Sequence, residues 1–267
     1  MITNNLVAAV LLAASWGPRA NAAENQTYNF GVVPQQGVAT LVKIWQPFFV
    51  ELSRRSGAAL QFATAPDIPA FENRILHEDY DFVYVNPYQY TLVRKNYEAF
   101  AREDIMLEGI LVVPRECPWR SVKELKDARI AMPSPIAYGA TILNKESLRE
   151  AGLDPEEDVF ISYLGSHDGA YGAVASGLAD AAGGVQRTFD LLPPEKRALL
   201  RVLHRTQGKV PHAFAAHRRV PRDTVKKVAA ALTAMYDDER GRAALTSISM
   251  QRIIKAQDSD WPELKGR

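Results

Sequence analysis

Short apolar runs alternate with amphipathic stretches along the first third of the chain. The runs are bounded by turn residues, and the stretches between them repeat apolar side chains every three or four positions. The predicted order is strand, helix, strand, helix, strand, over residues 28–33, 38–57, 59–64, 69–77 and 81–85. Such alternation predicts a parallel sheet covered by helices. A proline within the first helix, Pro47, is expected to bend or divide it.

The same alternation returns after residue 106. Residues 106–113 predict another strand, and Pro114 and Pro118 then mark a crossing into a second lobe. Beyond them the pattern predicts helices and strands in turn, over residues 121–127, 128–132, 137–150, 159–163, 168–176 and 181–185, then a strand at 213–216 and helices at 223–236 and 239–246. Trp261 is expected to anchor a surface tail. The pattern therefore predicts two α/β lobes, with 23–112 and 205–267 in the first and 113–204 in the second.

An aspartate precedes a short buried strand in both predicted lobes. Asp81 stands before FVYV, Asp180 stands before AAGGV, and a polar segment follows each strand. A carboxylate at a strand entry is well suited to accept backbone N–H groups. We expect both aspartates to be structural.

The first 22 residues have the pattern of an export signal. The apolar run 6–16 is shorter than the about 20 residues that a membrane-spanning helix needs. Ala20-Asn21-Ala22 matches a cleavage site, although no Lys or Arg precedes the run. We expect export, cleavage after Ala22 and a soluble mature protein.

Composition narrows the function classes. The 267 residues are 24% charged with a formal net charge of +1, which is unlike a nucleic-acid-binding protein with its basic face. The single cysteine, Cys117, forms no internal disulfide and is either a small apolar side chain or a soft ligand. The five histidines lack metal-ligand spacing, and no catalytic or cofactor motif is present. We expect neither a metal nor a cofactor.

Ligands of parallel α/β sheets bind beyond the carboxyl ends of the strands. The loops at those positions carry amides, phenols, an imidazole, a carboxylate and a guanidinium, which suit a small polar or anionic ligand. The candidate residues are Gln35, Gln36, Asn86, Tyr88, Ser134, Ala137, Tyr138, His167, Asp168 and Arg187.

Several segments together resemble a known family. FGVVP, DFVYVNPYQY, LVVPRE, SVKELKDARIAMPSP and GSHDGAYGAVASGLADAAGG are similar, over residues 28–250, to periplasmic substrate-binding proteins of phosphate, phosphite and phosphonate ABC transporters. The resemblance implies a two-lobed type II periplasmic binding protein, with mainly parallel sheets, that closes on its ligand and docks on a membrane permease. It also implies that the protein is a monomer and not an enzyme.

The resemblance assigns roles to particular residues. The family's oxyanion rests on a helix start that corresponds here to Ser134–Tyr138, where amides and the helix dipole favour an anion. The family's Ser-Thr-Ser-Gly run is replaced here by Ala137-Tyr138-Gly139-Ala140, so most hydroxyl donors are missing. Its aromatic contact corresponds to Tyr84 or to the NPYQY loop, and its His and acidic residue to His167 and Asp168.

Alternatives remain at this stage. Arg187 lies either on the surface or in the cleft, where its guanidinium would hold an oxyanion. Asp168 would repel a dianion unless it is protonated, faces an amine or pairs with Arg187. The ligand is therefore a phosphonate, phosphite, phosphate or another small anion. A sensory protein of the same fold, presenting an oxyanion such as arsenite to a membrane histidine kinase, is the alternative that Cys117 suggests, and an enzyme on this fold is a third.

Overall fold

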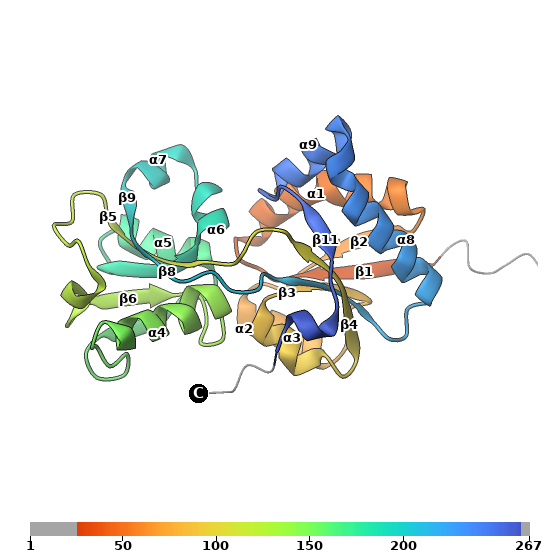
Figure 1. Ribbon diagram of the computed structural model, residues 1–267. Helices are drawn as coiled ribbons and strands as arrows, with labels where there is room; N and C mark the ends of the chain where they lie inside the picture. Colours follow the sequence, from red (N-terminus) through yellow and green to blue (C-terminus); the bar gives the residue numbers. More distant parts are fainter. Residues whose placement is uncertain (1–25, 263–267) are drawn as a thin grey trace, which may run out of the picture.

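Two sheets, each flanked by helices, lie side by side and are joined by two chain segments (Figure 1). The computed structural model describes residues 26–262, so the predicted export signal at 1–22 lies outside the described residues. Within that range, no helix combines the length and the hydropathy that crossing a membrane requires. The two-lobed α/β class is confirmed.

The first lobe is a six-stranded sheet with the strand order β11-β4-β10-β3-β1-β2. Helices α1, α8 and α9 cover one face, and α2 and α3 lie on the other (Figure 1). The strands are β1 (Thr27–Val32), β2 (Ala59–Ala63), β3 (Phe82–Val85), β4 (Tyr97–Glu103), β10 (Ala213–His217) and β11 (Ile253–Lys255). The helices are α1 (Val38–Ser56), α2 (Ile68–Leu76), α3 (Pro87–Val93), α8 (Arg222–Thr233) and α9 (Glu239–Ser247).

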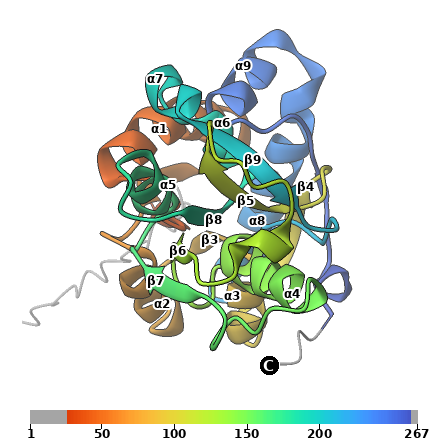
Figure 2. The same ribbon diagram turned by 90° about the vertical axis from the view of Figure 1, so that its left-hand side faces the viewer.

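The second lobe is a five-stranded sheet with the order β7-β6-β8-β5-β9. Its strands are β5 (Gly109–Pro114), β6 (Arg129–Met132), β7 (Phe160–Tyr163), β8 (Ala181–Val185) and β9 (Leu200–Arg205). Its helices are α4 (Leu143–Glu150), preceded by a π-helical turn η2 (Tyr138–Ile142), α5 (His167–Ala175), α6 (Gln186–Asp190) and α7 (Pro194–Ala198). Figure 2 shows α4 and α5 on opposite faces of this sheet.

The period of two along β5 explains how this sheet supports two cores. Ile110 and Val112 are buried in a cluster with α5, whereas Leu111 and Val113 are buried in another with α4. Successive side chains of a strand point to opposite faces, so a continuously apolar strand needs a helix on each side. The run GILVV thus predicts a strand that is covered on both faces.

The sheets are mixed rather than mainly parallel. β1 runs parallel to β2 and β3, and β6 runs parallel to β7 and β8. β10 is antiparallel to β3 and β4, and β5 is antiparallel to β8 and β9, because these strands enter each sheet from the other lobe. The strand expected at 106–113 begins at Gly109 and belongs wholly to the second sheet, so the chain crosses before residue 109 rather than after 112.

The two crossings pair with each other. Leu107 and Lys209 exchange backbone hydrogen bonds of 2.7 and 2.9 Å between the lobes. Near them, the Trp261 indole N–H donates to the Pro211 carbonyl at 2.9 Å, as expected for an anchor of the tail. Pro47 marks no boundary, because α1 continues through it.

The two aspartates have the expected structural role. Asp81 Oδ2 accepts the backbone N–H of Asn29 on β1 at 2.9 Å, and Asp180 Oδ2 accepts that of Arg129 on β6 at 2.8 Å. Each carboxylate also binds a guanidinium, from Arg219 and Arg129 respectively. Each aspartate thus ties its strand to the neighbouring parallel strand.

Candidate functional site

A small cavity lies where the two lobes meet. Its volume is about 10 Å³, which is room for roughly one water molecule. Its wall is formed by Val33, Gln35, Ile68, Asn86, Ala137, Tyr138, Gly139, Ala140, His167, Val185 and His212. The wall therefore takes residues from both lobes and from the second crossing.

Hydrogen bonds between the lobes close this cavity. The His167 N–H donates to the Gln35 carbonyl at 2.9 Å, and the Ile68 N–H donates to the Gly165 carbonyl at 3.1 Å. Asn86 Nδ2 donates to the Ile136 carbonyl at 3.3 Å. The structure is thus the closed arrangement of a two-lobed binding protein.

The start of the helix formed by η2 and α4 supplies backbone donors to the cavity wall. The N–H groups of Tyr138, Gly139 and Ala140 have no hydrogen-bond acceptor among the described residues, whereas those of Thr141 and Ile142 donate to the Ala137 carbonyl at 2.7 and 3.2 Å. The first amides of a helix lack intrahelical partners and carry the positive end of its dipole. This end of the helix is therefore suited to an anion.

Two glycines let this helix start lie against the second sheet. A Cβ atom on Gly183 would lie 2.1 Å from the Ala140 carbonyl oxygen, and one on Gly109 would lie 2.2 Å from that of Gly139. The buried Asn144 holds the same turn, because its Nδ2 donates to the Ala140 carbonyl at 2.9 Å and to that of Ile110 at 3.0 Å. Small residues on β5 and β8 thus fix where the free amides point.

His167, the first residue of α5, is held from within the second lobe. Its Nδ1 lies 3.0 Å from the Thr188 hydroxyl, which also lies 2.9 Å from the Tyr171 hydroxyl. Burial, with a smaller contribution from the Arg187 guanidinium, lowers the pKa of His167 to about 3. The imidazole is therefore neutral near pH 7 and offers a hydrogen bond rather than a charge.

Arg187 lies between the lobes and not on the surface. Its Nη1 donates to Glu103 Oε2 at 3.1 Å and its Nη2 donates to Gln35 Oε1 at 3.0 Å. The side chains of Arg187 and Glu103 are only 13% and 11% exposed, and the guanidinium lies 5.5 Å from the centroid of the Tyr84 ring. The guanidinium is thus already paired across the lobes.

The rings of Tyr84 and His212 stack beside the Arg187–Glu103 ion pair, with their centroids 5.0 Å apart. His212 Nε2 lies 3.5 Å from Gln35 Nε2. Burial lowers the pKa of His212 well below its usual value and raises that of Tyr84, so both rings are neutral. The Tyr84 hydroxyl is buried and has no partner among the described residues.

The structure brings five of the predicted residues into the cavity wall: Gln35, Asn86, Ala137, Tyr138 and His167. Tyr84 and Arg187 contact wall residues without lining the cavity. Gln36 and Ser134 are buried outside it, and Tyr88 packs on an apolar cluster with Tyr138.

Two of the remaining expectations are resolved by their contacts. Asp168 does not pair with Arg187; its Oδ2 accepts the Gly37 N–H from the other lobe at 3.1 Å, and burial raises its pKa. Cys117 does not lie in the cleft. It follows the end of β5 that points away from the crossing and packs on the core between α4 and the second sheet.

Glu103 and His212 were missed by the sequence analysis. Glu103 ends β4, a strand that the pattern did not predict. His212 directly precedes the strand Ala213–His217 at the second crossing. A polar residue directly before a buried apolar strand is the sequence signal that could have identified His212 as a site residue.

Comparison with known proteins agrees with this geometry. A family model described as the periplasmic substrate-binding protein of phosphonate ABC transporters matches residues 30–261. A search of curated proteins found no match.

Solved structures share the fold. A binding protein component of an ABC phosphonate transporter from Pseudomonas aeruginosa superposes with a TM-score of 0.78 at 16% identity, over 88% of this chain and 83% of its own. PhnD1 from Prochlorococcus marinus, in complex with methylphosphonate, gives a TM-score of 0.78 at 19% identity, over 88% and 94%. The alkanesulfonate-binding protein SsuA from Xanthomonas axonopodis pv. citri, bound to MOPS, gives 0.62 at 22% identity, over 85% and 80%. The match of the family model over most of the chain shows that this protein belongs to the periplasmic substrate-binding proteins of phosphonate ABC transporters.

Proposed function

We propose that this protein captures a small phosphorus oxyanion, such as a phosphonate or phosphite, between its lobes and delivers it to an ABC importer. The free amides of Tyr138, Gly139 and Ala140 in the wall of the interlobe cavity carry this proposal. Three backbone donors at one helix start match the oxygens of a tetrahedral anion without any hydroxyl donor.

Family membership supplies the wider setting. Members bind a small-molecule solute in the periplasm and act with a membrane permease, and they are not enzymes. The Prochlorococcus relative was solved with methylphosphonate, which supports this ligand class here. For this chain we further propose that residues 1–22 are cleaved and that the mature protein is a monomer.

Binding would proceed by closure of the lobes. In an open form, the anion meets the amides of the second lobe, and Asn86 and Gln35 of the first lobe then complete the shell. Because the closed cavity has a volume of only about 10 Å³, room for roughly one water molecule, it is smaller than a phosphorus oxyanion. The lobes must therefore separate for the ligand to enter, and they then close on it less far than in this structure. The ligand favours the closed state by binding both lobes at once.

The charge balance of the site favours a small, weakly charged anion. Arg187, which donates to the wall residue Gln35, is neutralised by Glu103, and Asp168 adds a carboxyl group at the lobe junction. His167 is neutral at physiological pH. We infer that a monoanion is preferred over a dianion.

Calorimetric titration with phosphate, phosphite, methylphosphonate and aminoethylphosphonate tests the proposal directly. We expect saturable binding of at least one of the four, and tighter binding of the monoanionic form as the pH is lowered toward 6. Methanesulfonate, a monoanion of similar shape, measures how much of the affinity depends on phosphorus. Absence of heat with all four phosphorus compounds contradicts the proposal.

The sensory alternative loses the feature that suggested it. Cys117 does not line the interlobe cavity, so it cannot ligate an ion bound there. A Cys117→Ser variant should therefore bind the same ligand with an unchanged dissociation constant.

A further inference from the structure

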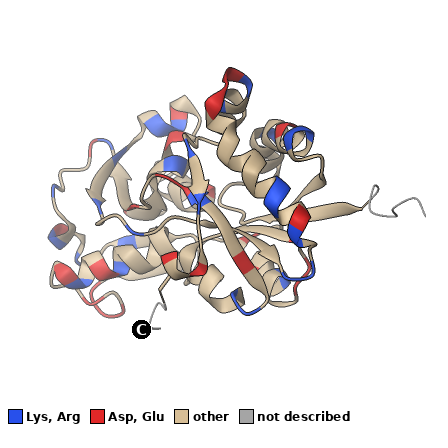
Figure 3. Cartoon of the chain, turned by 45° about the vertical axis from the view of Figure 1, so that its right-hand side comes forward, with Lys and Arg blue, Asp and Glu red and all other residues tan. Residues whose placement is uncertain are grey.

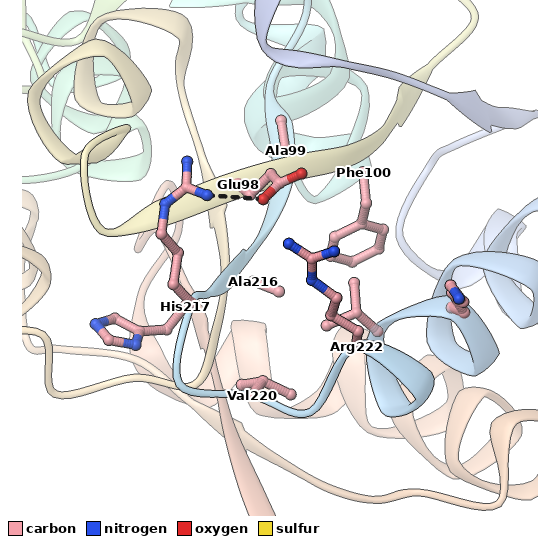
Figure 4. Close-up of a pocket in the computed structure, with 10 residues that line it drawn as sticks. Glu98, Ala99, Phe100, Ala216, His217, Val220 and Arg222 are labelled. Carbon is pink, nitrogen blue, oxygen red and sulfur yellow. Dashed lines mark hydrogen bonds and ion pairs between the residues drawn. The ribbon is translucent and has the colours of Figure 1, made fainter.

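A second hollow lies in the first lobe, away from the junction of the lobes. Its volume is about 410 Å³, and it opens between β4, the end of β10 and the start of α8 (Figure 4). It is lined by Glu98, Ala99, Phe100, Ala216, His217, Arg218, Val220, Arg222, Val225 and Lys226. We call it the α8 hollow.

The α8 hollow is separate from the interlobe cavity. His217 ends β10 in the α8 hollow, whereas His212 precedes the other end of β10 in the interlobe cavity. Five strand residues span roughly 17 Å. All the lining residues belong to one lobe, so closure of the lobes leaves the hollow intact.

Its floor is apolar. Phe100 is partly buried and packs edge-on against Phe82, with ring centroids 6.0 Å apart. Val220 is buried, and Ala216 and Val225 complete this surface. A flat aromatic ring and branched aliphatic side chains are the usual lining of small-molecule sites.

Its rim is cationic. Arg218 is occupied, because it donates to Glu98 Oε2 at 2.9 Å and to the Lys95 carbonyl at 3.0 Å. Arg222, the first residue of α8, has no hydrogen bond or ion pair with any described residue, and in Figure 4 its guanidinium extends over the hollow between Glu98 and Phe100. Lys226 stands one turn further along the helix and has only an exposed contact of 3.8 Å with Asp223.

This unpaired guanidinium is available to an acidic group. Figure 3 shows Lys and Arg interspersed with Asp and Glu over both lobes, and most of the arginines named above are held by carboxylates or carbonyls. A guanidinium beside an apolar floor offers two parallel N–H donors to a carboxylate or sulfonate. The amides at the start of α8, which has no side-chain N-cap, add positive potential at the same rim.

We propose that the α8 hollow binds a small amphipathic organic anion, with an aromatic or branched apolar body against Phe100 and Val220 and an acidic group on Arg222 and Lys226. A volume of about 410 Å³ falls within the range of about 300–1,000 Å³ typical of ligand pockets. An inorganic anion would make no contact with the apolar floor, and a neutral apolar molecule would not pair with Arg222 and Lys226. The proposal does not depend on what the interlobe cavity binds.

Fluorescence titration with 8-anilinonaphthalene-1-sulfonate tests it, since this probe combines an aromatic body with one sulfonate. We expect saturable binding at one site, weakened at least tenfold by Arg222→Glu and also weakened by Lys226→Glu. Lys227→Glu makes the same charge change at an exposed residue of the same helix that does not line the hollow, and it should change the dissociation constant less than twofold. Nuclear Overhauser contacts should join the probe to the Phe100 ring.

Three results would overturn the proposal. The first is absence of saturable binding, and the second is an equal loss of affinity in Arg222→Glu and Lys227→Glu. The third is displacement of the probe by methylphosphonate, which would place the probe between the lobes. All three variants alter exposed side chains, and matching thermal melting curves would show that they remain folded.

Discussion

The ion pair between Arg187 and Glu103 joins the lobes directly beside the interlobe cavity. The pair either supplies a cation to the bound anion or only ties the lobes together, and the substitution Glu103→Gln distinguishes these two roles. The glutamine keeps the shape and the hydrogen-bond acceptor of Glu103 but removes its charge. If Arg187 serves the anion, losing the competing carboxylate frees the guanidinium for the ligand. If the pair only ties the lobes together, the same change weakens closure.

The size of the effect follows from the geometry. At the observed 3.1 Å and an effective dielectric constant of about 20, the Coulomb attraction is about 5 kcal/mol. Desolvation of two mostly buried side chains offsets much of this gain. We expect a net shift of about 1.4 kcal/mol toward the ligand, which is a tenfold gain in affinity.

Calorimetry with methylphosphonate on three variants measures this shift. Arg187→Ala should bind at least tenfold more weakly than the original chain, because it removes the cation and leaves Glu103 buried without a partner. Glu108→Gln is the matched control, since its side chain is 44% exposed and pairs only loosely with Arg205 at 3.8 Å. A loss of affinity in Glu103→Gln would refute the reasoning and assign the pair to lobe closure alone.

Four further predictions concern the wall of the interlobe cavity and the elements behind it. Asn86→Ser keeps an N-cap for α3 but removes the amide donor to the other lobe, so the dissociation constant should rise severalfold in calorimetry while the melting temperature changes little. Gly183→Ala places a methyl group against the Ala140 carbonyl and should cost about 1–3 kcal/mol in urea unfolding as well as affinity. Gly172→Ala lies inside α5, and its methyl group meets no atom within 4 Å beyond its chain neighbours and the nearby backbone of the helix, so it should instead stabilise the protein by about 0.5–1 kcal/mol. Finally, the pKa of His167 is about 3 in the folded protein, whereas its usual value is about 6.5. As the pH falls, the imidazole is therefore protonated in the unfolded chain before it is protonated in the folded protein. The folded protein thus loses stability as the pH falls from 6.5 toward 3. At pH 4.5 this loss is at most about 2.7 kcal/mol, and the melting temperature of His167→Asn should depend less on pH in that window, whereas an unchanged slope would contradict the assignment.

The sequence pattern predicted the buried strands and the long helices but missed the strands in which charged and apolar residues are mixed. β1, β3, β6 and β8 are short and apolar and were predicted within one or two residues. β4 reads YEAFARE and β9 reads LRVLHR, so charged residues interrupt both. β4 is held in the sheet by β10 and β11, which lie more than a hundred residues further along the chain, and such pairing leaves no local signal.

The candidate site shows the same limit. The loop positions of Gln35, Asn86, Ala137, Tyr138 and His167 followed from the rule for strand ends, and all five line the cavity. The partner of Arg187 did not follow, because Glu103 ends β4 of the first lobe and meets Arg187 only where the two lobes come together. The closeness of the helix start to β8 was also hidden, since it depends on the missing side chain of Gly183.

The position of β10 bears on how the molecule assembles. This strand lies between β3 and β4 in the first sheet, yet the chain reaches it only after the whole second lobe has been completed. The second lobe is one continuous segment and can form its contacts as soon as its chain is free, whereas β4 has no neighbour in the first sheet until β10 returns. We therefore expect the second lobe to fold before the first. We also expect a fragment ending before residue 213 to expose the unpaired edges of β3 and β4 and to aggregate.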